Sequence, residues 1–125
     1  MEASTQPDNY AAPRPEELLK HLPAHIRERF AHFQASGDPA AADEVVLAIV
    51  RDHVPARKQG TIPAAITDEL SLTTDLGIDS VSIADPVFML EEVFDVPIAT
   101  KEIVRLSTVG DLRAFIRQKL AATRT

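Results

Sequence analysis

The stretch that decides the fold runs from 75 to 98 and reads DLGIDSVSIADPVFMLEEVFDVPI. Its apolar residues step by 4, 3 and 4 positions along Ile83, Val87, Leu90 and Phe94. This spacing is typical of one buried face of an amphipathic helix. Asp79 is suited to cap such a helix, with Ser80 in its first turn. We therefore predict a helix that starts at Asp79 and faces the core through those four apolar residues.

Helical spacing recurs on both sides of this stretch. It predicts a long helix over 42–53, a short one over 100–106, and another long one over 108–120 that opens with a capping box. The connection 55–79 contains Gly and Pro but also scattered apolar residues, so it should lie over the core with a helical turn or two. No long alternating pattern indicates a strand. We predict an all-α fold, a four-helix bundle of three main helices and one short helix.

An additional helix is predicted ahead of the bundle. Residues 1–15 are small and polar and lack periodicity, which is typical of a flexible tail. Between 16 and 37 the apolar residues again repeat at helical intervals, as Leu19, Leu22, Ile26, Phe30 and Phe33. Pro23 should kink this helix or start it. The Ser-Gly-Asp-Pro sequence at 36–39 ends it and caps the next helix, so the main domain is expected to span 38–125.

The N-terminal extension at 16–37 leaves two roles open. Its apolar face is suited to pack on the bundle or to dock a partner. A second stripe carries His21, His25, Arg29 and His32. This stripe indicates a solvated or partner-facing surface rather than a metal site, because Pro23 interrupts the spacing of the first two histidines.

Length and composition narrow the function classes. The chain has 125 residues, 45% of them hydrophobic, and no Cys. This length suits one domain with a modest core, and the lack of Cys excludes disulfides, a thiol nucleophile and thiolate metal sites. No apolar run approaches the length of a membrane span, and the N-terminus does not resemble a signal or transit peptide. We expect a cytoplasmic monomer.

The net charge of −6 is concentrated in one segment. The stretch 75–98 has no Lys or Arg but six acidic residues, Asp75, Asp79, Asp85, Glu91, Glu92 and Asp95. A field of one sign steers basic partners toward it and disfavours nucleic acid, whose phosphates need a basic surface. A charge run of this kind is also compatible with an ordinary solvated helix face.

Ser80 is the candidate site. The first turn of a helix offers free backbone N–H groups and a positive dipole end, which favour a phosphate. Ser80 is therefore suited to carry a phosphodiester, whereas no general base is positioned to make it a nucleophile by itself. Taken alone, an Asp-Ser pair at such a place is also an ordinary helix cap.

The quoted stretch resembles the signature of acyl carrier proteins, D-L-G-x-D-S followed by an acidic helix that ends E-E-x-F. The resemblance runs from 66 to 116, through ITDELSLTTDLG before the serine and ATKEIVRLSTVGDLRAFI after the acidic helix. It implies an acyl-carrier-like four-helix bundle with an additional N-terminal helix. It also implies that Ser80 is esterified with 4′-phosphopantetheine, which a phosphopantetheinyl transferase donates from coenzyme A.

The same resemblance implies a carrier that is not an enzyme. Acyl groups would be held as thioesters on the arm and presented to acyl-processing enzymes with basic patches, in fatty-acid, lipid or polyketide-type biosynthesis. The transferase would recognise Asp79, and the six acids with Val81 would form the docking surface. The candidates for an acyl pocket, or else ordinary core residues, are Ile83, Val87, Phe88, Leu90 and Phe94.

Departures from the family pattern favour a specialised carrier with dedicated partners. Pro86 lies within the helix after Ser80 and should kink it or restart it with Asp85 as cap. Val81 replaces the commoner Leu, and Ser82 replaces an acid. An aminoacyl or peptidyl carrier and an unmodified carrier-fold interaction module are the alternatives. A serine nucleophile is disfavoured because the G-x-S-x-G elbow is missing.

Overall fold

The computed structural model describes residues 15–63 and 65–124, so most of the predicted tail at 1–15 lies outside the described residues. The elements are α1 (Pro15–Leu18), α2 (Ala24–Ser36), α3 (Pro39–Asp52), α4 (Ala56–Gln59), α5 (Ala84–Phe94), α6 (Thr100–Ile103) and α7 (Val109–Arg124). Within the described ranges the only strand-like pairing is one isolated bridge between Ser71 and Thr108. None of the helices in these ranges is long and apolar enough to cross a membrane. The all-α prediction is confirmed.

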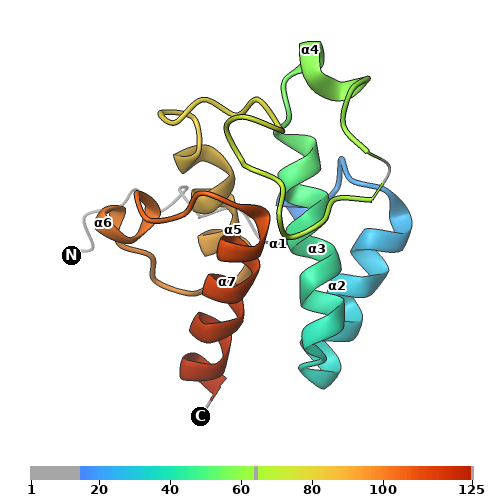
Figure 1. Ribbon diagram of the computed structural model, residues 1–125. Helices are drawn as coiled ribbons and strands as arrows, with labels where there is room; N and C mark the ends of the chain where they lie inside the picture. The colour runs from blue at the N-terminus through green and yellow to red at the C-terminus, as the bar shows by residue number, and fades with distance from the viewer. Residues whose placement is uncertain (1–14, 64, 125) are drawn as a thin grey trace, which may run out of the picture.

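Helices α3, α5 and α7 form the centre of the bundle, and α2 lies along the outer side of α3 (Figure 1). Each central helix contributes fully buried aliphatic side chains, such as Val45, Leu90 and Leu112. The short helix α6 lies between α5 and α7 in the chain. The core is thus mostly aliphatic, as the small number of aromatic residues requires.

The helix stop and the helix cap predicted at 36–39 separate the extension from the bundle. Gly37 adopts the left-handed region (φ 76°), and its N–H donates to the carbonyl of Phe33 over 2.7 Å. The Asp38 carboxylate accepts from the N–H of Ala40 at 3.0 Å and caps α3. At the other end of the extension, α2 begins directly after Pro23, so the proline starts this helix.

The apolar face of the extension packs on the bundle. All five residues of its apolar stripe are buried. The rings of Phe30 and Phe33 contact the ring of Phe94 in α5, with centroid separations of 5.9 and 5.4 Å. Of the two predicted roles for this face, packing on the bundle is confirmed.

The polar stripe of the extension faces acidic residues of α3. His21 Nε2 lies 2.8 Å from Asp52 Oδ2, and Arg29 Nε donates to Glu44 Oε2 over 2.8 Å. The His21 side chain is still 49% exposed. The stripe is therefore solvated, as predicted, and it also contacts acidic residues of α3.

Helix α5 starts later than predicted, and Pro86 explains why. The chain makes one helical turn from Asp79 to Ile83, whose N–H donates to the Asp79 carbonyl over 3.0 Å. Pro86 has no N–H for the carbonyl of Ser82, which accepts instead from the N–H of Asp85 at 3.0 Å. The regular helix begins only after Ile83, which takes the cap position without a side-chain hydrogen bond. The predicted restart is confirmed, but the prediction of Asp79 or Asp85 as the cap was wrong.

The connection from 55 to 79 lies over the core as predicted. It contains α4 and buries Ile66, Leu72 and Leu76. The N–H of Leu72 donates to the carbonyl of Ser107 over 2.9 Å, which ties the connection to the start of α7.

The start of α7 has the predicted capping box. Thr108 Oγ1 accepts from the N–H of Asp111 at 3.1 Å, and the Asp111 carboxylate accepts from the N–H groups of Ser107 and Thr108 at 3.1 Å each. These hydrogen bonds, led by the one from the Ser107 backbone, lower the pKa of Asp111 below its ordinary value of 3.8.

A buried carboxylate joins α3 to α7. Asp43 is 7% exposed, and its Oδ2 accepts from Arg113 Nη2 at 2.9 Å and also from Arg117. Arg113 donates in addition to Asp68 in the connection, at 2.6 Å. The hydrogen bond to Asp43 is the main cause of the raised pKa of Arg113. This cluster holds the connection against two helices of the bundle.

Candidate functional site

Ser80 lies in an exposed turn that follows a loop fixed by backbone hydrogen bonds. The N–H groups of Gly77 and Ile78 donate to the carbonyls of Thr73 and Leu72, both at 3.0 Å. Ile78 is buried, whereas Ser80 is exposed. The loop is therefore held by its own backbone, and it presents the serine hydroxyl to solvent.

The turn also offers backbone donors. Within the described part of the chain, the N–H groups of residues 79–82 have no hydrogen-bond acceptor. They precede α5, whose N-terminal dipole end favours an anion. A hydroxyl group among such donors fits an attached phosphodiester, although the regular helix starts four residues after Ser80 rather than at it.

Two cations of α4 contact the same loop, and the sequence did not indicate them. Gly77 is left-handed (φ 74°), and its carbonyl accepts from Arg57 Nη2 at 3.3 Å. The Lys58 side chain covers this glycine, because a β carbon there would meet Lys58 Cγ at 2.5 Å. No local spacing relates α4 to the loop, so only the folded chain reveals the contact.

The six acids of the predicted docking surface divide into two groups. Asp75 accepts from the N–H of Ser71 at 2.7 Å, and Glu91 accepts from the N–H of Ile98 at 3.0 Å. These two carboxylates therefore stabilise the local backbone through hydrogen bonds. The other four are exposed and make no side-chain hydrogen bond among the described residues, and they are Asp79, Asp85, Glu92 and Asp95. Unbalanced negative charge therefore lies on the surface of the turn and of α5.

The acyl-pocket candidates are buried, with one exception. Four of the five are at most 7% exposed and belong to the core, namely Ile83, Val87, Leu90 and Phe94. Phe88 is 45% exposed, so its prediction as an inward residue was wrong. Each residue along a helix rotates by about 100°, which turns Phe88 away from the face that contains Val87. Helical geometry was thus the signal that could have placed it outside.

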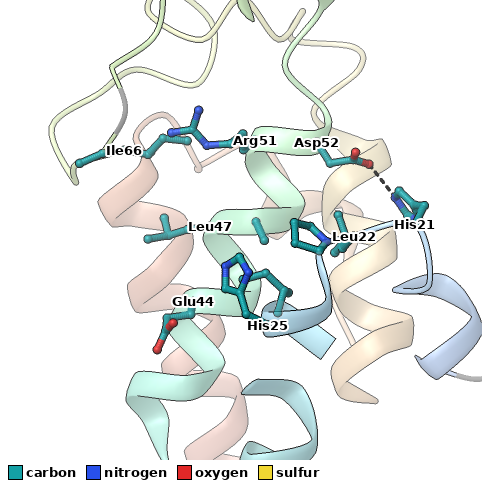
Figure 2. Close-up of a pocket in the computed structure, with 12 residues that line it drawn as sticks. His21, Leu22, His25, Glu44, Leu47, Arg51, Asp52 and Ile66 are labelled. Atoms are coloured by element: carbon teal, nitrogen blue, oxygen red, sulfur yellow. Dashed lines mark hydrogen bonds and ion pairs between the residues drawn. The ribbon is translucent and has the colours of Figure 1, made fainter. Parts of the chain in front are cut away.

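Two hollows lie away from these candidates. One of about 630 Å³ lies between the start of α2, helix α3 and the connection (Figure 2). Its walls include Leu22, Leu47 and Ile66, and the hydrogen bond between His21 and Asp52 lies at its edge. The other, of about 470 Å³, lies between the C-terminal parts of α2 and α7. None of the five acyl-pocket candidates lines either hollow.

Comparison with known proteins matches the part of the chain that contains Ser80. The family model described as the phosphopantetheine attachment site matches residues 56–116, from α4 into α7. The acyl carrier protein of Exiguobacterium sp. is 40% identical over 77 residues, which are 62% of this chain and 96% of that protein. The chain belongs to the acyl carrier protein family.

More distant acyl carrier proteins match a similar share of the chain. The acyl carrier protein of Thermotoga maritima is 32% identical over 80 residues, which are 64% of this chain and 98% of that protein. The meromycolate extension acyl carrier protein of Mycobacterium bovis is 31% identical over 80 residues, which are 64% of this chain and 68% of that protein. No solved structure gives a significant match. The family model begins at residue 56, so the N-terminal extension lies outside it.

Family membership identifies the cofactor and the general activity. An acyl carrier holds a covalent 4′-phosphopantetheine arm and works with partner enzymes. The arm supplies a terminal thiol that forms thioesters with acyl groups. Because this thiol belongs to the arm, an acyl carrier needs no Cys of its own, which agrees with the composition.

Proposed function

We propose that Ser80 is the residue that carries the 4′-phosphopantetheine arm. The observation that carries this proposal is its exposed hydroxyl in the turn whose N–H groups, at 79–82, face no acceptor among the described residues. A phosphodiester attached there lies among backbone donors and near the positive end of α5. Ser80 is also the serine of the D-L-G-x-D-S pattern.

A separate phosphopantetheinyl transferase moves the arm from coenzyme A to Ser80. The Ser80 oxygen forms the new bond to phosphorus, the pyrophosphate bond of coenzyme A breaks, and adenosine 3′,5′-bisphosphate leaves. This chain contributes a hydrogen-bonded loop that keeps the Ser80 hydroxyl in solvent. The transferase supplies the base that accepts the hydroxyl proton. Asp79 is the residue before Ser80 and is exposed. We assign Asp79 to recognition by the transferase.

Partner enzymes dock on the turn and on α5. Asp79, Asp85 and Glu92 provide exposed negative charge, which attracts basic patches. Val81 and Phe88, which are 86% and 45% exposed, provide apolar contacts on the same segment. Three further acids add to this field, namely Asp75, Glu91 and Asp95.

The cargo is an acyl group of fatty-acid, lipid or polyketide-type biosynthesis. The names of the relatives favour this cargo over the aminoacyl or peptidyl alternative. Pro86 and the N-terminal extension favour a specialised carrier with dedicated partners. Ile83 and Val87 line neither of the two hollows described above, so neither hollow is the pocket that this proposal places beside them. In this proposal the chain is a monomer in the cytoplasm and catalyses no reaction itself.

Intact mass spectrometry tests the attachment site. The full chain is incubated with a broad-specificity phosphopantetheinyl transferase and coenzyme A, as wild type, Ser80→Ala and Ser82→Ala. We expect one arm on the wild type and on the Ser82→Ala control, and none on Ser80→Ala. An arm that persists on Ser80→Ala contradicts the assignment. A wild type that takes up no arm supports the unmodified interaction module instead.

A further inference from the structure

We infer that Arg57 and Lys58 of α4 form a cationic binding site for the phosphodiester that joins the arm to Ser80. This inference rests on the proposed attachment at Ser80. It assigns the two side chains to the phosphate itself, rather than to a partner enzyme or to the fold alone.

The phosphodiester attached to Ser80 lies within a strongly acidic segment. The stretch 75–98 contains six carboxylates and no Lys or Arg, and one of the carboxylates, Asp79, is the residue next to Ser80. Attachment of the arm adds a further negative charge at this place, and like charges close together repel one another. Any compensating side chain has to come from another part of the chain.

The fold brings two cations to this segment. Arg57 Nη2 lies 3.3 Å from the Gly77 carbonyl, and Lys58 packs across the α carbon of Gly77. Ser80 follows Gly77 by three residues, so their α carbons lie at most about 11 Å apart. This separation is close to the Debye length of about 8 to 10 Å at moderate salt. Helix α4 and the turn before α5 also lie toward the same end of the bundle (Figure 1).

The observed contacts leave both side chains suited to a phosphate. Arg57 uses one nitrogen for a neutral carbonyl, and its other N–H donors form the fork that matches phosphate oxygens. Lys58 covers Gly77 with its aliphatic stem, so the ammonium group lies beyond this contact. Neither side chain forms an ion pair among the described residues. Their positive charges are therefore not neutralised by a carboxylate in that part of the chain.

Gly77 makes this approach possible. Its φ of 74° is a conformation that residues with a β carbon rarely adopt, and a β carbon would collide with Lys58. The glycine of the D-L-G-x-D-S pattern thus allows the Lys58 stem to lie directly on the loop that leads to Ser80.

The test compares the apo and arm-bearing forms of three full-length proteins. These are the wild type, the double variant Arg57→Gln with Lys58→Gln, and a control that removes two exposed cations from the extension, Lys20→Gln with Arg27→Gln. Two-dimensional NMR follows the side-chain Nε–H resonance of Arg57, and ³¹P NMR follows the phosphodiester. Thermal unfolding gives the change in Tm that the arm causes in each protein.

We expect the Arg57 resonance of the wild type to move when the arm is attached, and to return toward its apo position when salt is raised to about 300 mM. The ³¹P resonance of the double variant should differ from that of the wild type and of the control. The arm should lower Tm by about 1 to 4 °C more in the double variant than in the other two proteins.

An Arg57 resonance that stays in place when the arm is attached overturns the inference, even if the double variant fails to fold. Equal ³¹P resonances and equal changes in Tm in all three proteins overturn it as well. Mass spectrometry of the same samples distinguishes these results from failure of the proposed function, in which the wild type takes up no arm and both proposals fall.

Discussion

The ring of Phe33 meets the ring of Phe94 edge to face, with centroids 5.4 Å apart and an interplanar angle of 81°. Phe33 belongs to the N-terminal extension, and Phe94 ends the helix that follows Ser80. Both side chains are buried. The extension therefore shares one core with the carrier bundle, even though the family model does not reach it.

Truncation of this contact should destabilise the whole domain. We expect Phe33→Ala to lower the free energy of unfolding by about 3 to 5 kcal/mol, because it removes a buried ring and leaves a cavity. Gln34→Ala, at the next and exposed position of α2, should change it by less than about 0.5 kcal/mol. Urea unfolding measures both. A Phe33→Ala protein as stable as the Gln34→Ala control would contradict a shared core.

The buried carboxylate of Asp43 should contribute more to the free energy of unfolding than the exposed carboxylate of Glu44. Asp43→Asn weakens the bonds to Arg113 and Arg117, whose side chains are partly open to solvent at 28% and 56% exposure. We therefore expect a loss of about 1 to 3 kcal/mol, below the range for a fully buried pair. Glu44→Gln breaks only a surface pair with Arg29 and should cost less than about 1 kcal/mol. Equal losses in urea unfolding would contradict this order.

The capping box of α7 predicts a specific pH dependence. The pKa of Asp111 is lower in the folded chain than its ordinary value of 3.8, so its contribution to stability is present above 3.8 and is lost as the pH falls through the folded-state pKa. The difference in Tm between wild type and Asp111→Asn should therefore be largest near pH 7 and should shrink below 3.8. Glu28→Gln, at an exposed position of α2, serves as the control. A difference that stays constant down to about pH 3 would count against this role of Asp111.

The exposed acids predict a response to salt. Asp79, Asp85 and Glu92 repel one another when no partner is bound, and salt screens this repulsion. We expect Tm to rise between about 10 and about 300 mM NaCl. A variant with Asp79→Asn, Asp85→Asn and Glu92→Gln should respond less. A flat Tm for the wild type over this range would refute the prediction.

Local spacing was sufficient for most of the fold. The stripe that ends at Phe94, the stop at Gly37 and the cap at Asp38 were all predictable, because each depends on residues only a few positions apart. The start of α5 was harder to predict. Pro86 removes one hydrogen bond, but whether the chain kinks or restarts depends on which other N–H reaches the carbonyl of Ser82.

The candidate site was predictable only where it is local. The serine and its acids lie in one stretch of sequence, so Ser80 could be singled out before the fold was known. The contacts of Arg57 and Lys58 with Gly77 could not, because they join segments 20 residues apart through an irregular connection. The ion pair from Asp43 to Arg113 spans 70 residues and was equally invisible to spacing.

Peptide mapping tests the central claim most directly. No Lys or Arg lies between Lys58 and Lys101, so trypsin releases the segment 59–101 as one peptide that contains Ser71, Ser80 and Ser82. Tandem mass spectrometry of this peptide, after treatment of the wild type with transferase and coenzyme A, locates the arm. We predict that it is on Ser80 alone. An arm on Ser71 or Ser82, or a peptide that carries none, would contradict the account.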